Sequence, residues 1–478
     1  MNEPENRARR IILIGKTICL IAFLAANALN ALGSQKFDQF VAFGDSTLDT
    51  GYFYYHPEQT GPVFLPYLLN AVAKGATGGW AGGGVMNTTI LAEKFGLSAA
   101  SAAGGGSNYA VGGATTVPNS SPVIPGDYDP NWNPPIDNTT IAQIQNYLKT
   151  VNGAANPKAL YIIKTGDNDA TYVTNQIKND PTWLASNPAY LADGAAALAT
   201  EVAALQAAGA RIIVVRNSYD SALFAGTGGI ISGSNVAAYQ RTVALGTAEW
   251  ADLHSAGVQF VPADNDSLFS FVAENPTVFG FTPASVLASN APARGSTALV
   301  AILSAADQQD YLFVEGVHLT TAGQRIEADY TYDLLIAPNE ISMIPENAVQ
   351  LGLSRAATIQ RQIELFDQQR GPGGINLWVN FGTDSLRIKN ATGFPEASGN
   401  PFAGTVGVDH RSPSGLIVGV AFTGGNTIQE FATGGNFHQA DEVTSLYAAY
   451  QHGPVWGNAV ASYGLFQDNV TRPVTLGI

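Results

Sequence analysis

The chain has one cysteine, Cys19, among 478 residues, and charged side chains make up only 13% of the total. One cysteine excludes a disulfide framework and cysteine-based metal sites. Basic residues are scarce as well, since 23 Lys and Arg oppose 38 Asp and Glu and give a formal net charge of −15. Such an acidic chain is not expected to bind nucleic acid. Glycine (51 residues) and apolar side chains (46%) are plentiful, which suits an exported protein with glycine-rich β structure.

The first 33 residues have the layout of a secretory signal peptide. Three arginines stand before an apolar stretch at 11–31, which contains Ala26-Asn27-Ala28, an A-x-A-like cleavage site. The alternative is a membrane anchor, although the uninterrupted apolar part after Lys16 is short for a transmembrane span. We therefore expect residues 1–33 to direct export.

Residues 36–340 alternate strand-like apolar runs with helical patterns. The clearest helix has apolar residues at spacings of three and four over 191–205, and Gly209 is placed to end it. Continuous apolar runs at 160–163 and 212–215 stand before and after this helix as strands. Strand, helix and strand in this order predict an α/β fold with a parallel sheet covered by helices on both faces.

The pattern changes after residue 341. Residues 345–370 begin with Pro and read as one polar linking helix, which the glycines after 370 end. The helix carries a thin apolar stripe, formed by Val349, Leu353, Ala356, Ile363 and Phe366.

Runs with a period of two occupy 374–478, for example at 377–382 and 416–422. Alternating segments of about ten residues with scattered aromatics are typical of an outer-membrane β-barrel. A soluble antiparallel sheet fits the pattern alone equally well, and the signal peptide favours the barrel. We place about five strands before Ile478, fewer than the eight of the smallest bacterial barrels, and therefore expect a partial barrel from a truncated sequence.

The candidate nucleophile is Ser46, in the stretch FVAFGDSTLDTG at 40–51. A buried strand is predicted at 40–43, and Gly-Asp-Ser then forms a turn. Such turns are common, so Ser46 alone is as consistent with an ordinary turn as with catalysis. A nucleophilic serine also needs a base, an acid that orients the base, and donors for the oxyanion.

The stretch FVEGVHLTTAGQ at 313–324 supplies the base and the acid. Glu315 stands three residues before His318, so a tight turn can place the carboxylate against one ring nitrogen and leave the other for a hydroxyl. Thr321 and Gln324 have the spacing of a capping box, which predicts a helix directly after the histidine. A hydrogen-bonded loop histidine is the alternative.

Two further stretches can supply oxyanion donors. The glycine-rich loop at 104–116 permits close backbone approach and leaves N–H groups free to donate. Asn168, in TGDNDATY directly after the strand at 160–163, can direct its amide toward the crevice at the carboxyl ends of the strands. Asp167 and Asp169 suggest a metal site, but the glycine and glutamate of a calcium loop do not follow. We expect no metal and no cofactor.

Four blocks, FGDSTLDTG, SNYAVGGA, GDND and EGVH, occur in this order within 40–322. Taken together and in this order, the four blocks resemble those of the GDSL, or SGNH-hydrolase, family of esterases and lipases. The resemblance implies a three-layer α/β fold, with Ser46 as nucleophile, His318 as general base and Glu315 as its orienting partner. The chain has no G-x-S-x-G nucleophile elbow, which argues against an ordinary α/β-hydrolase.

The resemblance also implies an oxyanion hole made of the backbone N–H groups of Ser46 and Gly113 and the side chain of Asn168. Gly112 is the nearest competitor for the glycine role. Two positions depart from the family pattern: Glu315 stands where Asp is usual, and Leu319 replaces the proline after the histidine.

An exported domain of this kind, followed by a helix and alternating strands, resembles the autotransporter esterases of Gram-negative bacteria. This implies a serine ester hydrolase that acts on small-molecule or lipid esters through an acyl-enzyme, displayed at the cell surface by a β-domain in the outer membrane. A non-catalytic, adhesin-like passenger and a carbohydrate acetylesterase are the alternatives. The aromatic residues at 52–55 could wall an acyl pocket or belong to the core.

Overall fold

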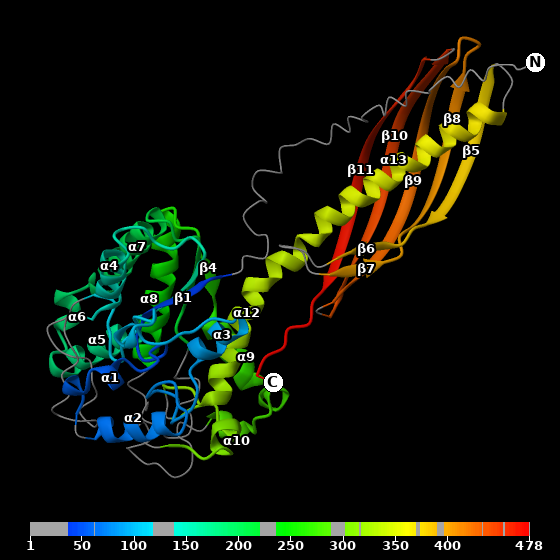
Figure 1. Cartoon of the computed structure of the whole chain (residues 1–478). Coiled ribbons are helices and arrows are strands. Elements are labelled where there is room, and N and C mark those ends of the chain that lie inside the picture. Colours follow the sequence, from blue (N-terminus) through cyan, green and yellow to red (C-terminus); the bar gives the residue numbers. More distant parts are fainter. Residues whose placement is uncertain are drawn as a thin grey trace, which may run out of the picture. The chain divides into compact units, whose positions relative to one another are not determined.

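The computed structural model describes residues 37–61, 63–117, 138–219, 236–287, 302–314, 317–369, 373–389, 396–432, 434–452 and 455–477. The described residues divide into two compact units, one that runs to 336 and includes 474–477, and one made of 337–473 (Figure 1). The signal peptide or anchor predicted at 1–33 lies outside the described residues.

The first unit is built on a parallel sheet of four strands in the order β1-β2-β3-β4. The strands are β1 (Gln39–Gly44), β2 (Ala159–Lys164), β3 (Ile212–Arg216) and β4 (Val261–Ala263). All six residues of β2 are buried, as are most residues of β1 and β3. Continuous apolar runs are required here because both faces of a parallel sheet are covered.

Alternate residues of the strands pack into two separate cores. Val41, Tyr161 and Ile213 contact one helix layer, and Phe40, Leu160 and Val214 contact another. The first layer includes α4 (Thr140–Thr150), α7 (Tyr190–Ala207) and α8 (Val236–Ser255), and the second includes α3 (Asn87–Lys94) and α12 (Thr321–Ile341). The predicted α/β fold with a parallel sheet between helices is confirmed.

Seven further α-helices belong to the described part of this unit, and most of them are labelled in Figure 1. They are α1 (Tyr52–Tyr55), α2 (Phe64–Ala73), α5 (Asp167–Asn179), α6 (Trp183–Ser186), α9 (Asn265–Glu274), α10 (Pro283–Leu287) and α11 (Asp307–Asp310). The predicted helix with its stop at Gly209 is α7, and Gly209 comes after it with a φ of 124°. No helix within the described ranges is long and apolar enough to cross a membrane.

A segment at 107–111 extends the sheet beside β1. Tyr109 and Val111 donate backbone hydrogen bonds to the carbonyls of Ala42 and Gly44, and Ala42 and Asn108 form a parallel bridge. The segment therefore ends at the same edge of the sheet as β1 and β2. The loops that begin after the three segments, at Asp45, Gly112 and Thr165, meet at that edge, where ligands bind in open parallel sheets.

The second unit contains an antiparallel sheet, as predicted for the C-terminal region. Its strands are β5 (Gly374–Thr383), β6 (Leu386–Ile388), β7 (Ala397–Gly399), β8 (Phe402–Arg411), β9 (Leu416–Phe431), β10 (Asn436–His452) and β11 (Val455–Thr471). β9 pairs with β10 and β10 with β11 over 15 and 17 residues. Leu377, Val379 and Phe381 of β5 are exposed, whereas Trp378 between them is buried.

Helix α13 (Met343–Gln369) packs on one face of the antiparallel sheet (Figure 1), where Ile359 and Ile363 share a buried core with Trp378 and other sheet residues. Its buried residues include Leu351, Arg355, Ile359 and Ile363, which recur every four positions. The predicted apolar stripe is therefore partly wrong, since the side chains of Val349 and Leu353 are exposed. The face of the sheet that α13 covers is partly polar. Arg355 therefore lies on the buried face of the helix, where it is bound to Asp441.

Candidate active site

Ser46 lies in the turn after β1, and its hydroxyl contacts His318. The distance from His318 Nε2 to Ser46 Oγ is 2.8 Å, although the two residues are 272 positions apart in the chain. Ser46 is 8% exposed and His318 9% exposed. The predicted nucleophile and base are thus brought into hydrogen-bond contact at a largely buried position.

The turn around Ser46 is held by the carboxylate of Asp45. Its Oδ1 accepts hydrogen bonds from the backbone N–H of Thr47 (2.9 Å) and from the Thr47 hydroxyl (2.7 Å). Burial raises the pKa of Asp45, with Lys164 acting in the opposite direction. The N–H of Thr47 is bonded to Asp45, whereas no hydrogen bond within the described residues uses the N–H of Ser46. The N–H of Ser46 is therefore available to donate to a ligand.

The loop that carries His318 is fixed on both sides. Val314 N–H donates to the carbonyl of His318 (2.8 Å), and the hydroxyl of Tyr219, which lies just after β3, donates to the carbonyl of Val317. Helix α12 then begins at Thr321, as predicted. Glu315, predicted to orient the histidine, lies outside the described residues.

The predicted capping box at the start of α12 is wrong. The hydroxyl of Thr320, one residue earlier, accepts from Gly323 N–H (3.5 Å). The Gln324 side chain accepts no hydrogen bond from the backbone N–H of Thr321, which donates to Gln308 Oε1 (2.8 Å), because Gln324 Oε1 accepts from the Asn87 side chain (2.6 Å). The spacing of Thr321 and Gln324 matches the motif, but the glutamine side chain is hydrogen-bonded to Asn87, a buried residue outside the helix.

Trp80 stacks on the imidazole of His318, with ring centroids 5.3 Å apart and an interplanar angle of 27°. The indole Nε1 donates to Asp49 Oδ2 (3.0 Å), which also accepts from the N–H of Gly112 (2.9 Å). The other oxygen of Asp49 accepts from the N–H groups of Gly51 and Tyr52, both at 2.8 Å. One buried carboxylate therefore joins the segment after Ser46, the ring on the histidine and the glycine loop.

Asp49 is fully buried, and burial raises its pKa, while the four hydrogen bonds it accepts act to lower it. Four donors around one carboxylate satisfy a group that would otherwise be costly to bury. The sequence pointed to neither Asp49 nor Trp80 as a site residue. Asp49 lies in the block FGDSTLDTG and could have been found there, whereas Trp80 stands isolated in a glycine-rich loop.

Gly112 and Gly113 are distinguished by their backbone contacts. The N–H of Gly112 is bound to Asp49, whereas no hydrogen bond within the described residues engages the N–H of Gly113, whose φ is 82°. Gly112 has no room for a side chain, since a Cβ there would stand 2.0 Å from the Trp80 ring. The two glycines therefore have different tasks: Gly112 makes room for Trp80, and Gly113 keeps a free donor.

Asn168 lies in the first turn of α5, directly after β2. Its Nδ2 donates to the carbonyl of Ala114 (2.8 Å), the residue after Gly113. A carboxamide carries two N–H donors, so this contact holds the amide beside the glycine loop and leaves one donor. Asn168 is only partly buried.

The acidic residues on either side of Asn168 have protein partners. Asp167 pairs with the fully buried Lys164, and Asp169 accepts from the N–H (2.8 Å) and the hydroxyl (3.0 Å) of Thr116. Burial raises the pKa of Asp169 to about 7, against the effect of the Thr116 hydrogen bonds. Across the described part of the chain, no three His, Cys, Asp or Glu side chains are grouped so as to hold a metal ion.

The aromatic residues after Ser46 divide between two roles. Phe53 is buried in a core cluster with Phe64 and Trp80. Tyr54 and Tyr55 are partly exposed and line a cavity of about 480 Å³ together with apolar residues such as Leu97. The lining residues of this cavity nearest to Ser46 in the chain are Thr50 and Gly51.

Comparison with known proteins gives two family matches. The family described as GDSL-like Lipase/Acylhydrolase matches residues 40–331, and the Autotransporter beta-domain matches residues 377–478. The first match covers more than half of the chain and includes Ser46, Gly113, Asn168 and His318.

Similar proteins come from two pseudomonads. The esterases EstA of Pseudomonas aeruginosa and Pseudomonas putida are each 27% identical over 492 residues, which cover 96% of this chain and 72% of the relative. An uncharacterized protein from the trpE-trpG intergenic region of Pseudomonas putida is 26% identical over 98% of this chain and 77% of its own length.

Proposed function

The chain belongs to the GDSL-like lipase/acylhydrolase family, and on this premise we propose that it hydrolyses carboxylic esters through a covalent acyl-enzyme on Ser46. It is an ester-bond hydrolase located in the outer membrane, with an autotransporter β-domain and a surface-exposed passenger. The observation that carries the proposal is the 2.8 Å contact between Ser46 Oγ and His318 Nε2.

The first half of the reaction forms the acyl-enzyme. Ser46 Oγ attacks the carbonyl carbon of the ester while His318 Nε2 takes the hydroxyl proton. The bond from carbon to the alcohol oxygen then breaks, and His318 returns the proton to the leaving alcohol. In the second half, His318 takes a proton from a water whose oxygen attacks the acyl carbon. The bond from this carbon to Ser46 Oγ then breaks, His318 returns the proton to Ser46, and the carboxylic acid leaves.

Three donors face the negative charge that develops on the carbonyl oxygen. They are the N–H of Ser46, the N–H of Gly113 and the second Nδ2 hydrogen of Asn168. The choice of Gly113 over Gly112 is supported by the bond between Gly112 N–H and Asp49. Fixed donors of this kind stabilise the tetrahedral oxyanion more than the substrate carbonyl, which lowers the barrier.

Glu315 is proposed as the residue that orients His318. A carboxylate on the other ring nitrogen selects the tautomer that leaves Nε2 as an acceptor for the serine proton, and Glu serves this role in some serine hydrolase triads. The stacked Trp80 ring limits rotation of the imidazole from its face.

The proposed substrates are small-molecule or lipid esters, and the proposed reaction uses no cofactor. We also propose that a signal peptide at 1–33 precedes a hydrolase domain at 36–340, which the helix at 345–370 joins to the β-domain at 374–478. The extents of the two family matches, 40–331 and 377–478, support these limits.

The test compares the full chain with Ser46→Ala in outer-membrane fractions of a Gram-negative host. Hydrolysis of p-nitrophenyl esters of graded chain length is measured at equal amounts of folded protein. We expect Ser46→Ala to abolish hydrolysis and to prevent labelling by a fluorophosphonate, which forms a stable adduct with an activated serine. Equal hydrolysis by the two proteins would rule out Ser46 as the nucleophile, and labelling at another serine would identify its replacement.

A further inference from the structure

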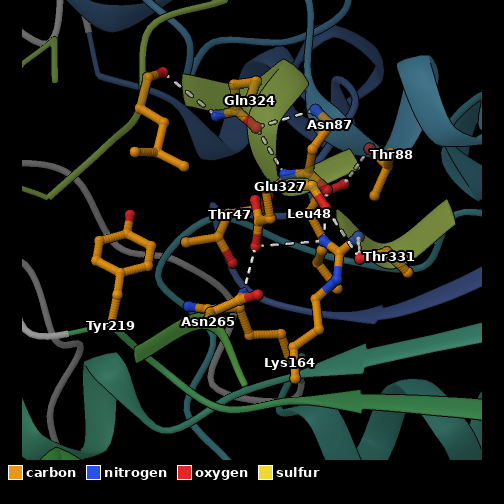
Figure 2. Close-up of polar contacts among 12 residues, drawn as sticks. Thr47, Leu48, Asn87, Thr88, Lys164, Tyr219, Asn265, Gln324, Glu327 and Thr331 are labelled. Carbon is orange, nitrogen blue, oxygen red and sulfur yellow. Dashed lines mark hydrogen bonds and ion pairs between the residues drawn. The ribbon is translucent and has the colours of Figure 1, made fainter. Parts of the chain in front are cut away.

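Asn87, the first residue of α3, is buried between the serine turn and helix α12. Its Nδ2 donates to the carbonyl of Thr47 (2.9 Å) and to Oε1 of Gln324 (2.6 Å), as Figure 2 shows. Its backbone N–H donates to the same Gln324 oxygen (2.9 Å). One side chain thus connects two elements that are far apart in the sequence.

Gln324 extends this connection to the histidine loop. Its Nε2 donates to the carbonyl of Leu319 (3.3 Å), the residue directly after His318. Thr47, at the other end, is the residue directly after Ser46. The hydrogen bonds of Asn87 and Gln324 therefore join the two peptide carbonyls that come next after the nucleophile and the base.

Arg216, at the end of β3, fixes which groups donate and which accept in these hydrogen bonds. A guanidinium has only donors, and Arg216 Nη1 donates to Asn87 Oδ1 (2.6 Å). The Asn87 amide must then present its NH₂ group to Thr47 and Gln324. Gln324 in turn presents its oxygen to Asn87 and its NH₂ group to Leu319.

Arg216 is itself held in a buried polar cluster. It is fully buried, donates from Nη2 to the hydroxyl of Thr331 (2.9 Å) and lies 3.4 Å from Glu327 Oε1. Asn265 donates to the same Glu327 oxygen (2.6 Å), as Figure 2 shows. A buried charge pair is costly when it is not hydrogen-bonded on all sides, and Arg216 Nε has no hydrogen-bond partner among the described residues. Apolar residues already pack α3 and α12 against the sheet. Packing alone therefore does not account for the cluster.

We propose that Asn87 is a positioning residue that sets the separation and alignment of Ser46 Oγ and His318 Nε2. The inference rests on the proposed function, in which these two atoms exchange a proton. The bond between them depends on the relative position of two loops from opposite ends of the hydrolase unit. Asn87 fixes that position because it is bonded to both loops and its own orientation is imposed by Arg216.

Two substitutions at this position separate hydrogen bonding from volume. Asn87→Ala removes the whole side chain, whereas Asn87→Asp keeps its shape and its contact with Arg216 but replaces both donors with an acceptor. We expect each to lower kcat by about 10- to 100-fold with KM within about twofold, since a displacement of about 1 Å costs roughly that much. Gln324→Ala should lower kcat by a similar factor. The double variant Asn87→Ala/Gln324→Ala should lower kcat little more than either single variant, because each substitution already breaks the same hydrogen-bonded connection.

Tyr147→Phe is the matched control. It removes a buried hydrogen bond between the Tyr147 and Tyr161 hydroxyls (2.8 Å), which lies in the core on the other face of the sheet. We expect this variant to unfold at lower temperature while its kcat stays within about twofold of the unchanged chain. All variants are assayed as the full chain in detergent micelles, at temperatures where tryptophan fluorescence reports a folded protein.

The outcomes distinguish the inference from the function on which it rests. Loss of activity in Ser46→Ala together with unchanged kcat in Asn87→Ala and Asn87→Asp would overturn the positioning role alone. Full activity in Ser46→Ala would overturn the proposed function. A fall in kcat for Tyr147→Phe equal to that of Asn87→Asp, or a double variant whose losses multiply, would also contradict the inference, because the effect would then be one of general stability.

Discussion

The sheets of the two compact units differ in what they bury and what they expose. In the parallel sheet of the hydrolase unit both faces are apolar and covered by helices. In the antiparallel sheet of the β-domain one face exposes large apolar side chains such as Leu377 and Phe381, and the other buries polar side chains such as Asp441 together with apolar ones. The difference reflects the surroundings, since lipid accepts an apolar exterior and water does not.

Buried charge is also used differently in the two units. In the hydrolase unit the Arg216 and Glu327 pair lies behind the proposed catalytic residues. In the β-domain, Arg355 binds Asp441 through two nitrogens, at 3.1 and 3.0 Å, and joins the helix to the sheet. We therefore expect a broken contact in the first unit to affect catalysis and one in the second to affect assembly.

The largest effect is expected for Arg355→Ala, which leaves Asp441 buried without its partner. Removing one member of a buried pair costs about 3–5 kcal/mol, so the β-domain should unfold at a clearly lower urea concentration, measured by the mobility of unheated samples in SDS gels. Arg361→Ala, at an exposed position of the same helix, is the control. Equal unfolding of the two variants would show that the pair does not hold the helix.

Asn168→Ala should have the next largest effect, and in the hydrolase unit alone. Loss of one oxyanion donor costs about 2.7–4 kcal/mol of transition-state stabilisation, so kcat/KM should fall by roughly a few hundredfold while the β-domain unfolds as before. Asn179→Ala, at the exposed end of the same helix α5, should keep full activity. A loss of less than about threefold in Asn168→Ala would remove it from the oxyanion hole.

Gly112→Ala tests the packing of Trp80 on the histidine. The new methyl group would stand 2.0 Å from the Trp80 ring, so the ring must move, which costs about 1–3 kcal/mol of stability by overpacking. We expect kcat to fall because His318 loses its stacked partner. Gly194→Ala, in α7 with open space around it, should instead raise the unfolding temperature slightly. Equal behaviour of the two variants would contradict the tight packing at Gly112.

Counted per pH unit, the smallest effect is a dependence of the free energy of unfolding on pH through Asp169. Its folded-state pKa of about 7 lies above the ordinary value of 3.8, so between these values the folded state keeps a proton that the unfolded state has released. Stability should therefore fall as pH rises through this window, by about 1 kcal/mol per pH unit. Asp169→Asn should flatten this decline in the fluorescence melting curve of the hydrolase unit; an unchanged slope would mean that Asp169 is ionised throughout.

Local pattern was enough to predict the elements that carry the site. The apolar runs of β2 and β3, the helix α7 with Gly209 after it, and the start of α12 behind His318 are all explained by short-range periodicity and turn chemistry. Ser46, Gly113, Asn168 and His318 came from ordered motifs. Each of these signals is complete within a few residues, so a single sequence contains it.

Contacts between distant segments could not be predicted in this way. Arg216 reads as the charged end of a strand, and nothing near it in the chain indicates that it is buried beside Asn87. The spacing of Thr321 and Gln324 predicts a capping box for the same reason, since Asn87, the partner of Gln324, is 237 positions away. The buried face of α13 is predicted only in part because the helix packs against a partly polar interior. Apolar residues alone therefore do not identify the buried face.

The separation of Ser46 and His318 by 272 positions has a consequence for export. A chain that has only partly crossed the outer membrane holds the serine and the histidine on different sides or in unfolded segments, so on the proposed roles it has no competent nucleophile. Contacts between residues so far apart in the sequence are typical of slowly folding chains. On the proposed roles, hydrolysis measured at the cell surface therefore reports only those molecules whose passenger has both emerged and folded.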